Sequence, residues 1–487
     1  MSSAASPRTR NLLTMLVSVV VLTLFVSSHP GMAASQSVRR AVVYLPLIRQ
    51  SSQPGSLPGR TVPVTGSLQA AVDVAQPGDR LVLQGRIYAG DISITRAGAA
   101  AKPIAIQGAG RGVTKLRGNI SLRDSAAFWI IEDLDVDAGA DGDAVRLSAP
   151  AHDLTLRRVH LYNGDGYGVR IGNDTSNVLI EDCEIDHFDA GEEDAHGVGI
   201  MTASDVTIRR CDIHHNSGDA VQSNTPDYPG YGRFASNILV ESNQLHHNRE
   251  NALDIKSTHG LLAHNNRAWG FRAVSSSDGM AIQVQYDARD IKIQNNEVWD
   301  AVEGIEVSRG SKNGTEYPAA PQRVTIARNL FRDLVAAPDG DSGNGSGIVI
   351  RASSDVQVYN NTVLRAARFG MCISTSGGDA YPRSVDVRNN VLEGALSDLT
   401  FGFDPGRIDG LTVDYNHYTN RLVNGNNIAD WQGAGYDHHA TGGAPLLDTM
   451  LAPTPTSPLR DSGADVGFAF SGRAPDRGWR EAGPRVP

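Results

Sequence analysis

The chain has 487 residues, of which 51 are glycine and only 6% are aromatic, and its formal net charge is −10. This negative charge argues against a nucleic-acid-binding protein, which would carry a basic stripe. The length suggests about three domains, unless the sequence is repetitive and a single solenoid absorbs most of it.

The first residues have the features of an export signal. Arg8 and Arg10 precede an apolar run from Leu12 to Val26, and small residues follow around Gly31. The run of about 15 residues is short for a membrane span and right for a signal peptide, with an uncleaved anchor as the alternative. We therefore expect residues 1–34 to be a signal peptide, the protein to be secreted, and no membrane segment to remain after cleavage.

A linker and a capping helix are expected next. Residues 35–62 are predicted to be a linker, because the chain from Ser51 to Pro63 is rich in Ser, Pro and Gly. The segment Ser67-Leu-Gln-Ala-Ala-Val-Asp-Val-Ala is amphipathic and begins with a serine that can cap a helix. We expect it to cover the first coil of a solenoid, since an open solenoid end exposes strand edges.

Short β-rich fragments recur from about residue 156 to residue 391. Aligning them places one residue of each fragment in a single inward column: Val159, Cys183, Cys211, Asn243, Asn266, Asn296, Asn329, Asn361 and Asn390. The intervals are 24, 28, 32, 23, 30, 33, 32 and 29 residues. Such a period without a helical pattern indicates one coil per repeat. Coils stack about 4.8 Å apart, so like residues form rows, and the asparagines can bond from coil to coil.

Three cysteines are too few for a disulfide framework. Cys183 and Cys211 replace asparagine in the inward column, so buried thiols are expected. A disulfide between these adjacent coils is the alternative.

A second fragment with period-two alternation precedes each of these repeats. Its outward positions form three columns. The first runs through Asp143, Tyr167, His196, Asp219, Asn251, Asp278 and Glu303. The second runs through Arg146, Arg170, Gly199, Gln222, Asp254, Ala281 and Glu306. The third runs through Ser148, Gly172, Met201, Asn224, Lys256, Gln283, Ser308 and Arg351.

These patterns predict an all-β chain whose body, residues 63–441, is a parallel β-helix. Residues 442–487 are Pro-rich and irregular, and we expect them to form a C-terminal cap over the last coils.

The opening of the predicted solenoid resembles a known group of enzymes. The segment that starts at Ser67, followed by Gly85-Arg-Ile-Tyr-Ala-Gly and Lys102-Pro-Ile-Ala-Ile, resembles the start of right-handed β-helix polysaccharide lyases. The most similar are the calcium-dependent pectate lyases of family 9, and the chondroitinase B and alginate lyase group opens in a similar way. The resemblance spans about residues 60 to 475 and implies a right-handed, single-stranded, pectate lyase-like β-helix.

A candidate calcium site lies in the most acidic coils. Asp219 comes from one coil, and Glu250, Asn251 and Asp254 come from the next. Carboxylate and amide oxygens converging from adjacent coils suit Ca²⁺, which takes about six to eight oxygen ligands. The string Glu250-Asn-Ala-Leu-Asp254 also resembles the Asp-Asp-Gly-x-Asp run that binds calcium in family 9. A solvated acidic face is the alternative.

Lys256 is the candidate catalytic base. A uronate lyase removes the C5 proton next to the carboxylate, and a lysine can do so only if burial or a nearby cation lowers its pKa. The chondroitinase B group resembles this arrangement, with a lysine following metal-binding acids on one strand. An ion pair of Lys256 with Asp254 or Glu306 is the alternative.

Further side chains are candidates for holding substrate. Arg170, Arg309 and Arg351 could bind substrate carboxylates as bidentate donors, and His196 lies in the same outward columns. Tyr228, Tyr231 and Phe234 in the loop Thr225–Ser236 could stack on sugars. His214-His215-Asn216 and His246-His247-Asn248 occupy equivalent turns, where repetition of a turn is favoured over a zinc site.

The expected function is calcium-assisted β-elimination of an acidic, uronate-containing polysaccharide such as pectate by a monomeric enzyme. The alternatives are a glycoside hydrolase, a C5 epimerase, and a non-catalytic carbohydrate-binding or surface protein. The Asn-Thr-Asp, Asp-Asp, Gly-His-Gly and Arg-Ile-Lys motifs of polygalacturonases are absent, and so is the Asp-Pro-His-Asp string of alginate epimerases.

Overall fold

The computed structural model describes residues 59–140, 142–223, 233–274, 276–312, 315–337, 345–375 and 380–482. The signal peptide predicted at residues 1–34 lies outside this part of the chain, and so does the predicted linker up to residue 58. The described chain begins as a parallel strand at Thr61, two residues before the predicted start of the solenoid at 63. Neither helix in the described ranges has the length and hydropathy of a membrane span.

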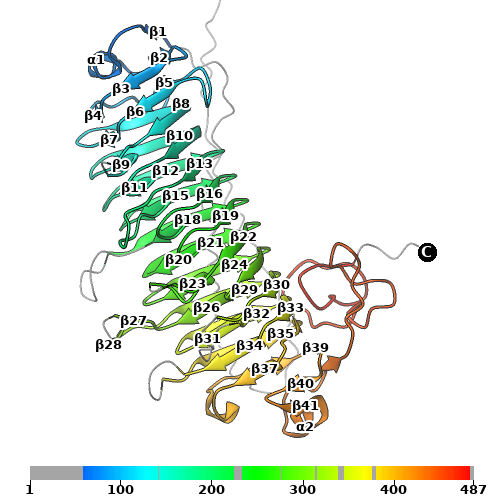
Figure 1. Ribbon diagram of the computed structural model, residues 1–487. Helices are drawn as coiled ribbons and strands as arrows, with labels where there is room; N and C mark the ends of the chain where they lie inside the picture. Colours follow the sequence, from blue (N-terminus) through cyan, green and yellow to red (C-terminus); the bar gives the residue numbers. More distant parts are fainter. Residues whose placement is uncertain are drawn as a thin grey trace, which may run out of the picture. The chain divides into compact units, whose positions relative to one another are not determined.

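The predicted capping helix is present as α1 (Leu68–Val74), at the N-terminal end of the stack of coils (Figure 1). The Ser67 side chain accepts a hydrogen bond from Ala70 N at 3.3 Å, as an N-cap does. Leu68 and Val72 are buried against the first coil. The helix therefore closes an end of the solenoid that would otherwise expose apolar side chains.

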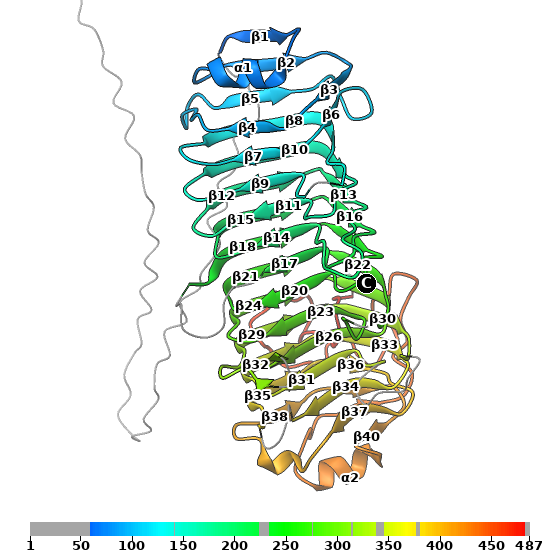
Figure 2. The same cartoon turned by 60° about the vertical axis from the view of Figure 1, so that its left-hand side comes forward.

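The strands of the described chain are arranged in parallel coils, most of them with three strands each. One 14-stranded sheet, called sheet B here, forms one side of every coil (Figure 2). Its strands are β4 (Ile92–Ile94), β7 (Ile120–Leu122), β9 (Val145–Leu147), β11 (Val169–Ile171), β14 (Val198–Ile200), β17 (Val221–Ser223), β20 (Leu253–Lys256), β23 (Met280–Gln285), β26 (Glu303–Ser308), β31 (Ile348–Arg351), β34 (Phe369–Ser374), β37 (Ser397–Phe401), β40 (Leu422–Val423) and β41 (Asn426–Asn427).

The 26-stranded sheet, called sheet A, supplies the other two sides. Its first row is β1 (Thr61–Val64), β2 (Arg80–Leu83), β5 (Ile104–Gln107), β8 (Ala127–Asp137), β10 (His152–Tyr162), β12 (Ser176–Glu181), β15 (Ser204–Arg209), β18 (Ala235–Glu241), β21 (Thr258–His264), β24 (Arg289–Gln294), β29 (Gln322–Ala327), β32 (Ser354–Tyr359), β35 (Arg383–Arg388) and β38 (Thr412–Asp414). Its second row is β3 (Ile87–Ala89), β6 (Lys115–Arg117), β13 (Glu184–Asp186), β16 (Asp212–His214), β19 (Gln244–His246), β22 (Arg267–Phe271), β25 (Glu297–Ala301), β30 (Leu330–Leu334), β33 (Thr362–Ala366), β36 (Val391–Leu392), β39 (His417–Tyr418) and β42 (Thr441–Gly442). The long strands β8 and β10 run through both rows.

Three small elements lie outside these rows. They are the antiparallel pair β27 (Ser311–Lys312) and β28 (Thr315–Glu316), the 3-10 helix η1 (Pro405–Arg407) and the helix α2 (Ile428–Gly433). Trp431 of α2 is buried near the last strands of sheet B.

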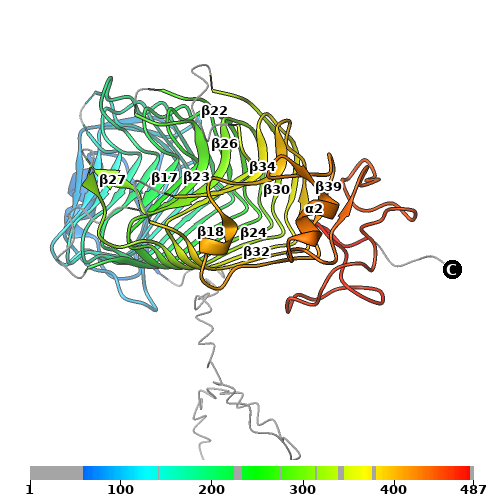
Figure 3. The same cartoon turned by 90° about the horizontal axis from the view of Figure 1, so that it is seen from below.

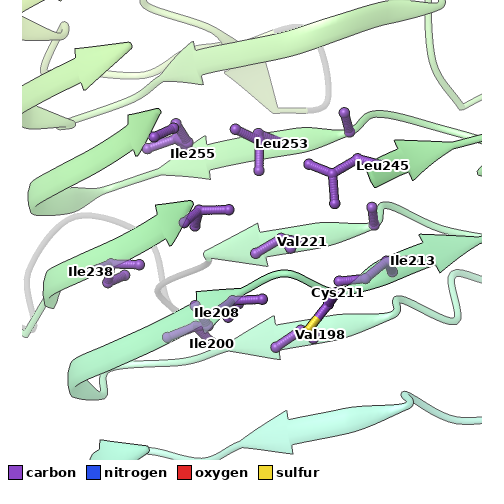
Figure 4. Close-up of a cluster of buried hydrophobic side chains, with 14 of the residues drawn as sticks. Val198, Ile200, Ile208, Cys211, Ile213, Val221, Ile238, Leu245, Leu253 and Ile255 are labelled. Atoms are coloured by element: carbon purple, nitrogen blue, oxygen red, sulfur yellow. The ribbon is translucent and has the colours of Figure 1, made fainter. Parts of the chain in front are cut away.

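Alternation with period two builds the core. Val198, Ile200 and Ile208 point inward from β14 and β15, and all three are fully buried. Figure 4 shows the same arrangement repeated one and two coils away, with Val221, Leu253 and Ile255 from sheet B. Each coil therefore buries aliphatic side chains against the coils above and below it, and the hydrophobic gain accumulates along the stack.

A row of buried asparagines lines the bend between the two rows of sheet A. Asn243 Nδ2 donates to Asn266 Oδ1 at 3.0 Å, and Asn266 Nδ2 donates to Asn296 Oδ1 at 3.0 Å. The same side-chain bond joins the pairs Asn296–Asn329, Asn329–Asn361, Asn361–Asn390 and Asn390–Asn416. Backbone amides bond along the same line, so the polar groups of a buried bend are satisfied.

Cys183, Cys211 and Cys372 are free and buried. The backbone amide of Cys211 donates to Asn243 Oδ1, so this cysteine occupies the next position in the line of asparagines. Burial holds the pKa of the Cys211 thiol well above its ordinary value. The expectation of buried thiols is confirmed.

The C-terminal segment after Gly442, described as far as residue 482, contains no long strand there and lies against the bends of the last coils (Figures 1 and 3). Arg477, 3% exposed, donates to Asn416 O at 3.0 Å and to Thr441 Oγ1 at 2.8 Å. Gly478 N donates to Asn389 O at 2.7 Å. These bonds fasten the irregular cap to the bends of the solenoid.

Candidate functional site

The acidic cluster lies on sheet B and on the turns that lead into β17 and β20. Gln222 pairs with Asp254 across these strands, which places Asp219 and Asn251 in the same register three residues earlier. Asp219, Gln222, Glu250, Asn251 and Asp254 are all at most 6% exposed. The cluster is therefore a built polar site inside the protein, and the alternative of a solvated acidic face is wrong.

Asp254 has three polar partners in the cluster. Its Oδ2 lies 2.5 Å from Lys256 Nζ, and Gln222 Nε2 donates to the same oxygen at 3.5 Å. Gln285 Nε2 donates to Asp254 Oδ1 at 3.1 Å. Three neighbouring side chains thus fix the orientation of this carboxylate, and two of them come from other coils.

Asp219 lies one coil from Asp254 and is fully buried. It accepts a bond from Asn251 N at 2.9 Å and one from Gln222 Nε2 at 2.8 Å. Burial, reinforced by repulsion from Asp254 and Glu250, raises the pKa of Asp219 well above its ordinary value. Burial also raises the pKa of Glu250. The positive charge of Lys256 favours ionisation of both carboxyl groups, but it is outweighed by their burial and by repulsion from neighbouring carboxylates.

His196 supports this cluster from behind. It is 2% exposed, and its Nδ1 accepts a hydrogen bond from Asp219 N at 2.8 Å. Burial and the nearby cations lower the pKa of His196 to about 3, so the ring is neutral. The expected contact of His196 with substrate is not what the structure provides, because the ring is enclosed and bonded to the backbone of Asp219.

The pKa of Lys256 is not lowered, as the role of a catalytic base would require. Burial lowers its pKa, but the charges of Asp254 and Asp219 raise it more, and the net pKa lies above the ordinary value. The ion pair with Asp254 that was the alternative interpretation is present. The sequence could reveal the strand position of Lys256, but not the balance between burial and two converging carboxylates.

The predicted calcium ligands do not all converge. Asp219 and Glu250 each offer a ligand atom within 4.8 Å of the other and of His196, which was predicted to bind substrate, whereas Asp254 is turned to Lys256. Asn251 Nδ2 donates to Met280 O at 2.7 Å. Because His196 Nδ1 is already an acceptor, the donors that remain in the group are mainly carboxylate oxygens. Such a set fits a hard divalent cation such as Ca²⁺, and the like charges of Asp219 and Glu250 favour one.

The three predicted arginines lie apart from one another. Arg170 is three strands away from Asp254 in sheet B, and its Nε donates to Asp143 Oδ2 at 2.8 Å. Arg351 Nη1 lies 3.6 Å from Glu306 Oε2, on the other side of the cluster. Arg309 follows β26, and its carbonyl accepts a bond from Tyr286 N. The structure therefore does not gather these residues around Lys256.

One coil was placed in the wrong register. Asp254 pairs with Gln283 and Lys256 with Gln285, while Met280 pairs with Glu303. The residues of this coil in the three outward columns are therefore Met280, Gln283 and Gln285. Each lies two residues later than the predicted Asp278, Ala281 and Gln283. A shift of two residues keeps the same side chains facing outward, so the period-two pattern does not distinguish the two registers.

Two side chains of the cluster were not singled out from the sequence. Gln285 reaches Asp254 only in the corrected register. Glu303 is 1% exposed, and burial together with the charge of Glu306 raises its pKa well above the ordinary value. Of the loop aromatics, Tyr228 and Tyr231 lie outside the described residues. Phe234 stacks on His259, with ring centroids 3.8 Å apart.

The comparison with protein families agrees with this architecture. A family model described as a right handed beta helix region matches residues 143–331. The chain folds as a right-handed parallel β-helix. A comparison with curated protein sequences finds no match.

Solved structures with the same fold include polysaccharide lyases. A mannuronic acid specific family 6 lyase from human gut microbiota aligns with 74% of this chain and 85% of its own, at 14% identity and a TM-score of 0.52. A PL6 family polysaccharide lyase from Pseudopedobacter saltans aligns with 76% of this chain and 94% of its own, at 14% identity and a TM-score of 0.51. The pectate lyase Pel9A aligns with 88% of this chain and 98% of its own, at 13% identity and a TM-score of 0.44. At these identities the likeness concerns the β-helix fold.

Proposed function

We propose that this β-helix protein is a polysaccharide lyase that cleaves an acidic, uronate-containing polysaccharide by cation-assisted β-elimination. The observation that carries the proposal is the convergence of Asp219, Glu250, Asp254 and Lys256 from adjacent coils of sheet B. Burying three carboxyl groups and an ammonium in one place costs folding free energy, so such clusters concentrate at functional sites. The polysaccharide lyases with the same fold support the class of reaction.

Each side chain has a distinct role in this proposal. Lys256 is the proton acceptor, and its side chain, 20% exposed, is the member of the cluster that reaches the surface. Asp254 orients the Lys256 ammonium and is itself held by Gln222 and Gln285. His196 is a positioning residue, since it fixes the backbone of Asp219.

Asp219 and Glu250 are the residues that would hold the cation, for which Ca²⁺ is the candidate. A divalent cation at this point would neutralise the substrate carboxylate and acidify the C5 proton. Lys256 can accept that proton only when its pKa falls, which requires that the field of Asp219 and Asp254 be offset by positive charge. Arg351 and Arg170 are candidates for more distant sugar carboxylates along sheet B.

A hydrolase is the second candidate, because Glu303 and Glu306 provide a specific observation in its favour. Burial raises the pKa of Glu303 well above its ordinary value, while Glu306 Oε2 lies 3.6 Å from Arg351 Nη1. Two neighbouring carboxyl groups in unlike environments are the pairing that glycoside hydrolysis uses.

A panel of acidic polysaccharides tests the proposal. Polygalacturonate and alginate would be incubated with the protein, with and without a chelator, and unsaturated product would be followed by its ultraviolet absorbance. We expect product that disappears on chelation. New reducing ends without absorbance would favour the hydrolase, and binding without any product would favour a carbohydrate-binding protein.

We also propose that the protein is exported by residues 1–34 and acts outside the cell as a monomer. The support is the basic start, the apolar run and the small residues of that segment. N-terminal sequencing of the secreted protein would test the cleavage, and light scattering of the purified protein would test the oligomeric state.

A further inference from the structure

Two pairs of histidines repeat in consecutive coils on the second row of sheet A, away from the strands of the acidic cluster. β16 and β19 pair in parallel, with His214 opposite His246. His215 and His247 follow directly, each with a positive φ, 54° and 51° respectively. The sequence favoured repetition of a turn over a zinc site at these histidines. The side-chain geometry favours the opposite conclusion.

The rings of the first pair are held by stacking along the solenoid. His214 and His246 lie with centroids 4.8 Å apart and planes 15° apart, and His246 lies 4.2 Å from Trp269 at 14°. Trp269 in turn stacks on Trp299 at 4.7 Å. Because ring faces are covered by neighbouring rings, the edges that carry the nitrogens are the parts left for other partners. Such a stack suits coordination through nitrogen rather than stacking on a sugar.

The two nitrogens of each ring have different partners. His214 Nδ1 lies 2.8 Å from His215 Nδ1, and His246 Nδ1 lies 2.8 Å from His247 Nδ1. The Nε2 atoms face carboxylates, with His246 Nε2 3.0 Å from Asp212 Oδ1 and His214 Nε2 3.6 Å from Glu184 Oε1. Imidazoles and carboxylates thus alternate along one edge of two coils.

We propose that Asp212, His214 and His246 form a binding site for a divalent transition metal of the zinc class. Their ligand atoms all lie within 4.8 Å of one another. Two imidazole nitrogens and a carboxylate oxygen form a ligand set that zinc accepts. Two ligands of a tetrahedral zinc are separated by about 3.4 Å, given zinc–ligand bonds of about 2.0–2.1 Å. The ligand atoms therefore need to approach one another by at most about 1.4 Å to close the site.

The other groups around the site are compatible with this assignment. Asp186 is committed to His160 and His187, so it does not compete for His214. Arg111 is paired with Glu184 rather than with Asp212. His214 and His246 side chains are each 14% exposed and that of Asp212 is 38% exposed, so a metal ion can reach all three.

A polar hollow borders the Asp212 side of the site. It has a volume of about 440 Å³, and Asp212, Glu184, Arg111, Arg210 and Gln244 are among its lining residues. Three protein ligands leave a fourth position for water or for Glu184. Since the ligands come from two coils, binding would also tie β16 to β19 and stabilise the folded chain by linkage.

Titration of the purified protein with Zn²⁺, followed by calorimetry and by the unfolding temperature, tests the site. We expect one tight binding event in the wild type, a higher unfolding temperature with Zn²⁺, and visible absorption bands when Co²⁺ replaces Zn²⁺. His246→Gln and Asp212→Asn should each weaken this event at least tenfold and remove the thermal shift.

His264→Gln is the matched control. His264 lies on β21 of the same sheet and has its own carboxylate partner, Glu241, at 3.1 Å, but it is not part of the three-ligand group. This variant should bind Zn²⁺ as the wild type does. Unchanged affinity in His246→Gln, or no binding by the wild type, would overturn the proposal. The unfolding temperatures without metal show whether each variant is folded, and uronate cleavage plays no part in the outcome.

Discussion

Lys256 Nζ lies 2.5 Å from Asp254 Oδ2, and the two side chains leave the same face of β20 two residues apart. An outward pair on one short strand would normally be exposed, yet Asp254 is 3% exposed. The pair is enclosed because Gln222 and Gln285 from the flanking strands bond to the Asp254 carboxylate. Because the pair is enclosed, removal of either charge should change the free energy of unfolding measurably.

Removal of both partners should destabilise the protein by less than the sum of the two single removals. Asp254→Asn leaves the Lys256 ammonium in a buried place without its counter-charge, which should lower the free energy of unfolding by about 3 kcal/mol. Lys256→Met should have a similar effect, and the double variant should lose less than the sum. Chemical unfolding of the four proteins measures the coupling, and purely additive losses would contradict a buried ion pair.

The row of asparagines should dominate the stability of the bends. Asn296→Ala removes the acceptor of Asn266 Nδ2 and also removes the donor to Ala263 O and Asn329 Oδ1. We therefore expect the free energy of unfolding to fall by about 3 kcal/mol. The neighbouring Asn295 is exposed and has a φ of 56°, so Asn295→Gly should change stability by less than about 0.5 kcal/mol. Equal unfolding midpoints for the two variants would show that the row contributes little.

His417 should make the C-terminal coils sensitive to acid. Its ring is fully buried between Thr441 Oγ1 and Gly443 O, and burial lowers its pKa to about 4. The pKa of a histidine in the unfolded chain is about 6.5, so between about pH 6.5 and pH 4 the unfolded chain binds a proton that the folded protein does not. The neutral ring therefore stabilises the fold fully above about pH 6.5, and this contribution is lost as the pH falls toward 4.

The measurement for His417 is the difference in unfolding free energy between the wild type and His417→Gln as a function of pH. The wild type should lose about 3 kcal/mol relative to the variant between pH 7 and pH 4. Asp398 and Asp437 have pKa values raised to about 6 and act in the opposite direction, but they are common to both proteins and cancel. A difference that is independent of pH would contradict the neutral buried ring.

Glycines at the close contacts between coils should not tolerate a side chain. A Cβ on Gly304 would lie 2.3 Å from Gly347 O and 2.5 Å from a ring carbon of Phe331. Gly304→Ala should therefore cost about 1–3 kcal/mol through displacement of the next coil. Gly433→Ala in α2 meets nothing within 4 Å and should be neutral or slightly stabilising. Thermal unfolding of both variants tests the spacing of the coils.

The solenoid could be predicted from the sequence because its signals are local and repeated. Two patterns recur in coil after coil: the bend that contains Asn243, and the alternation shown by Val198 and Ile200. Because each pattern is repeated many times, a chance match in one coil does not decide the prediction. The register of the coil that contains Met280 was misjudged by two residues, which leaves the alternation of inward and outward positions unchanged and therefore unable to reveal the error.

The site was only partly predictable for a different reason. Pairing of strands brings Asp219 and Asp254 into neighbouring coils, as the columns predicted, and Glu250 lies beside Asn251 of the first column. The pKa of Lys256, however, depends on whether burial or the charges of Asp219 and Asp254 prevail, and the enclosure of His196 depends on loops from other coils. Such balances depend on three-dimensional distances that no repeat pattern contains.

The initial rate of double-bond formation on uronate polymers tests the central claim most directly. The wild type would be compared with Lys256→Ala and with Lys292→Ala, a control on β24 of sheet A that lies outside the acidic cluster. We predict unsaturated product from the wild type and from Lys292→Ala, and a rate at least a hundredfold lower, about 2.7 kcal/mol in activation free energy, for a folded Lys256→Ala. Undiminished double-bond formation by Lys256→Ala, or none by the wild type on any uronate polymer, would contradict the account.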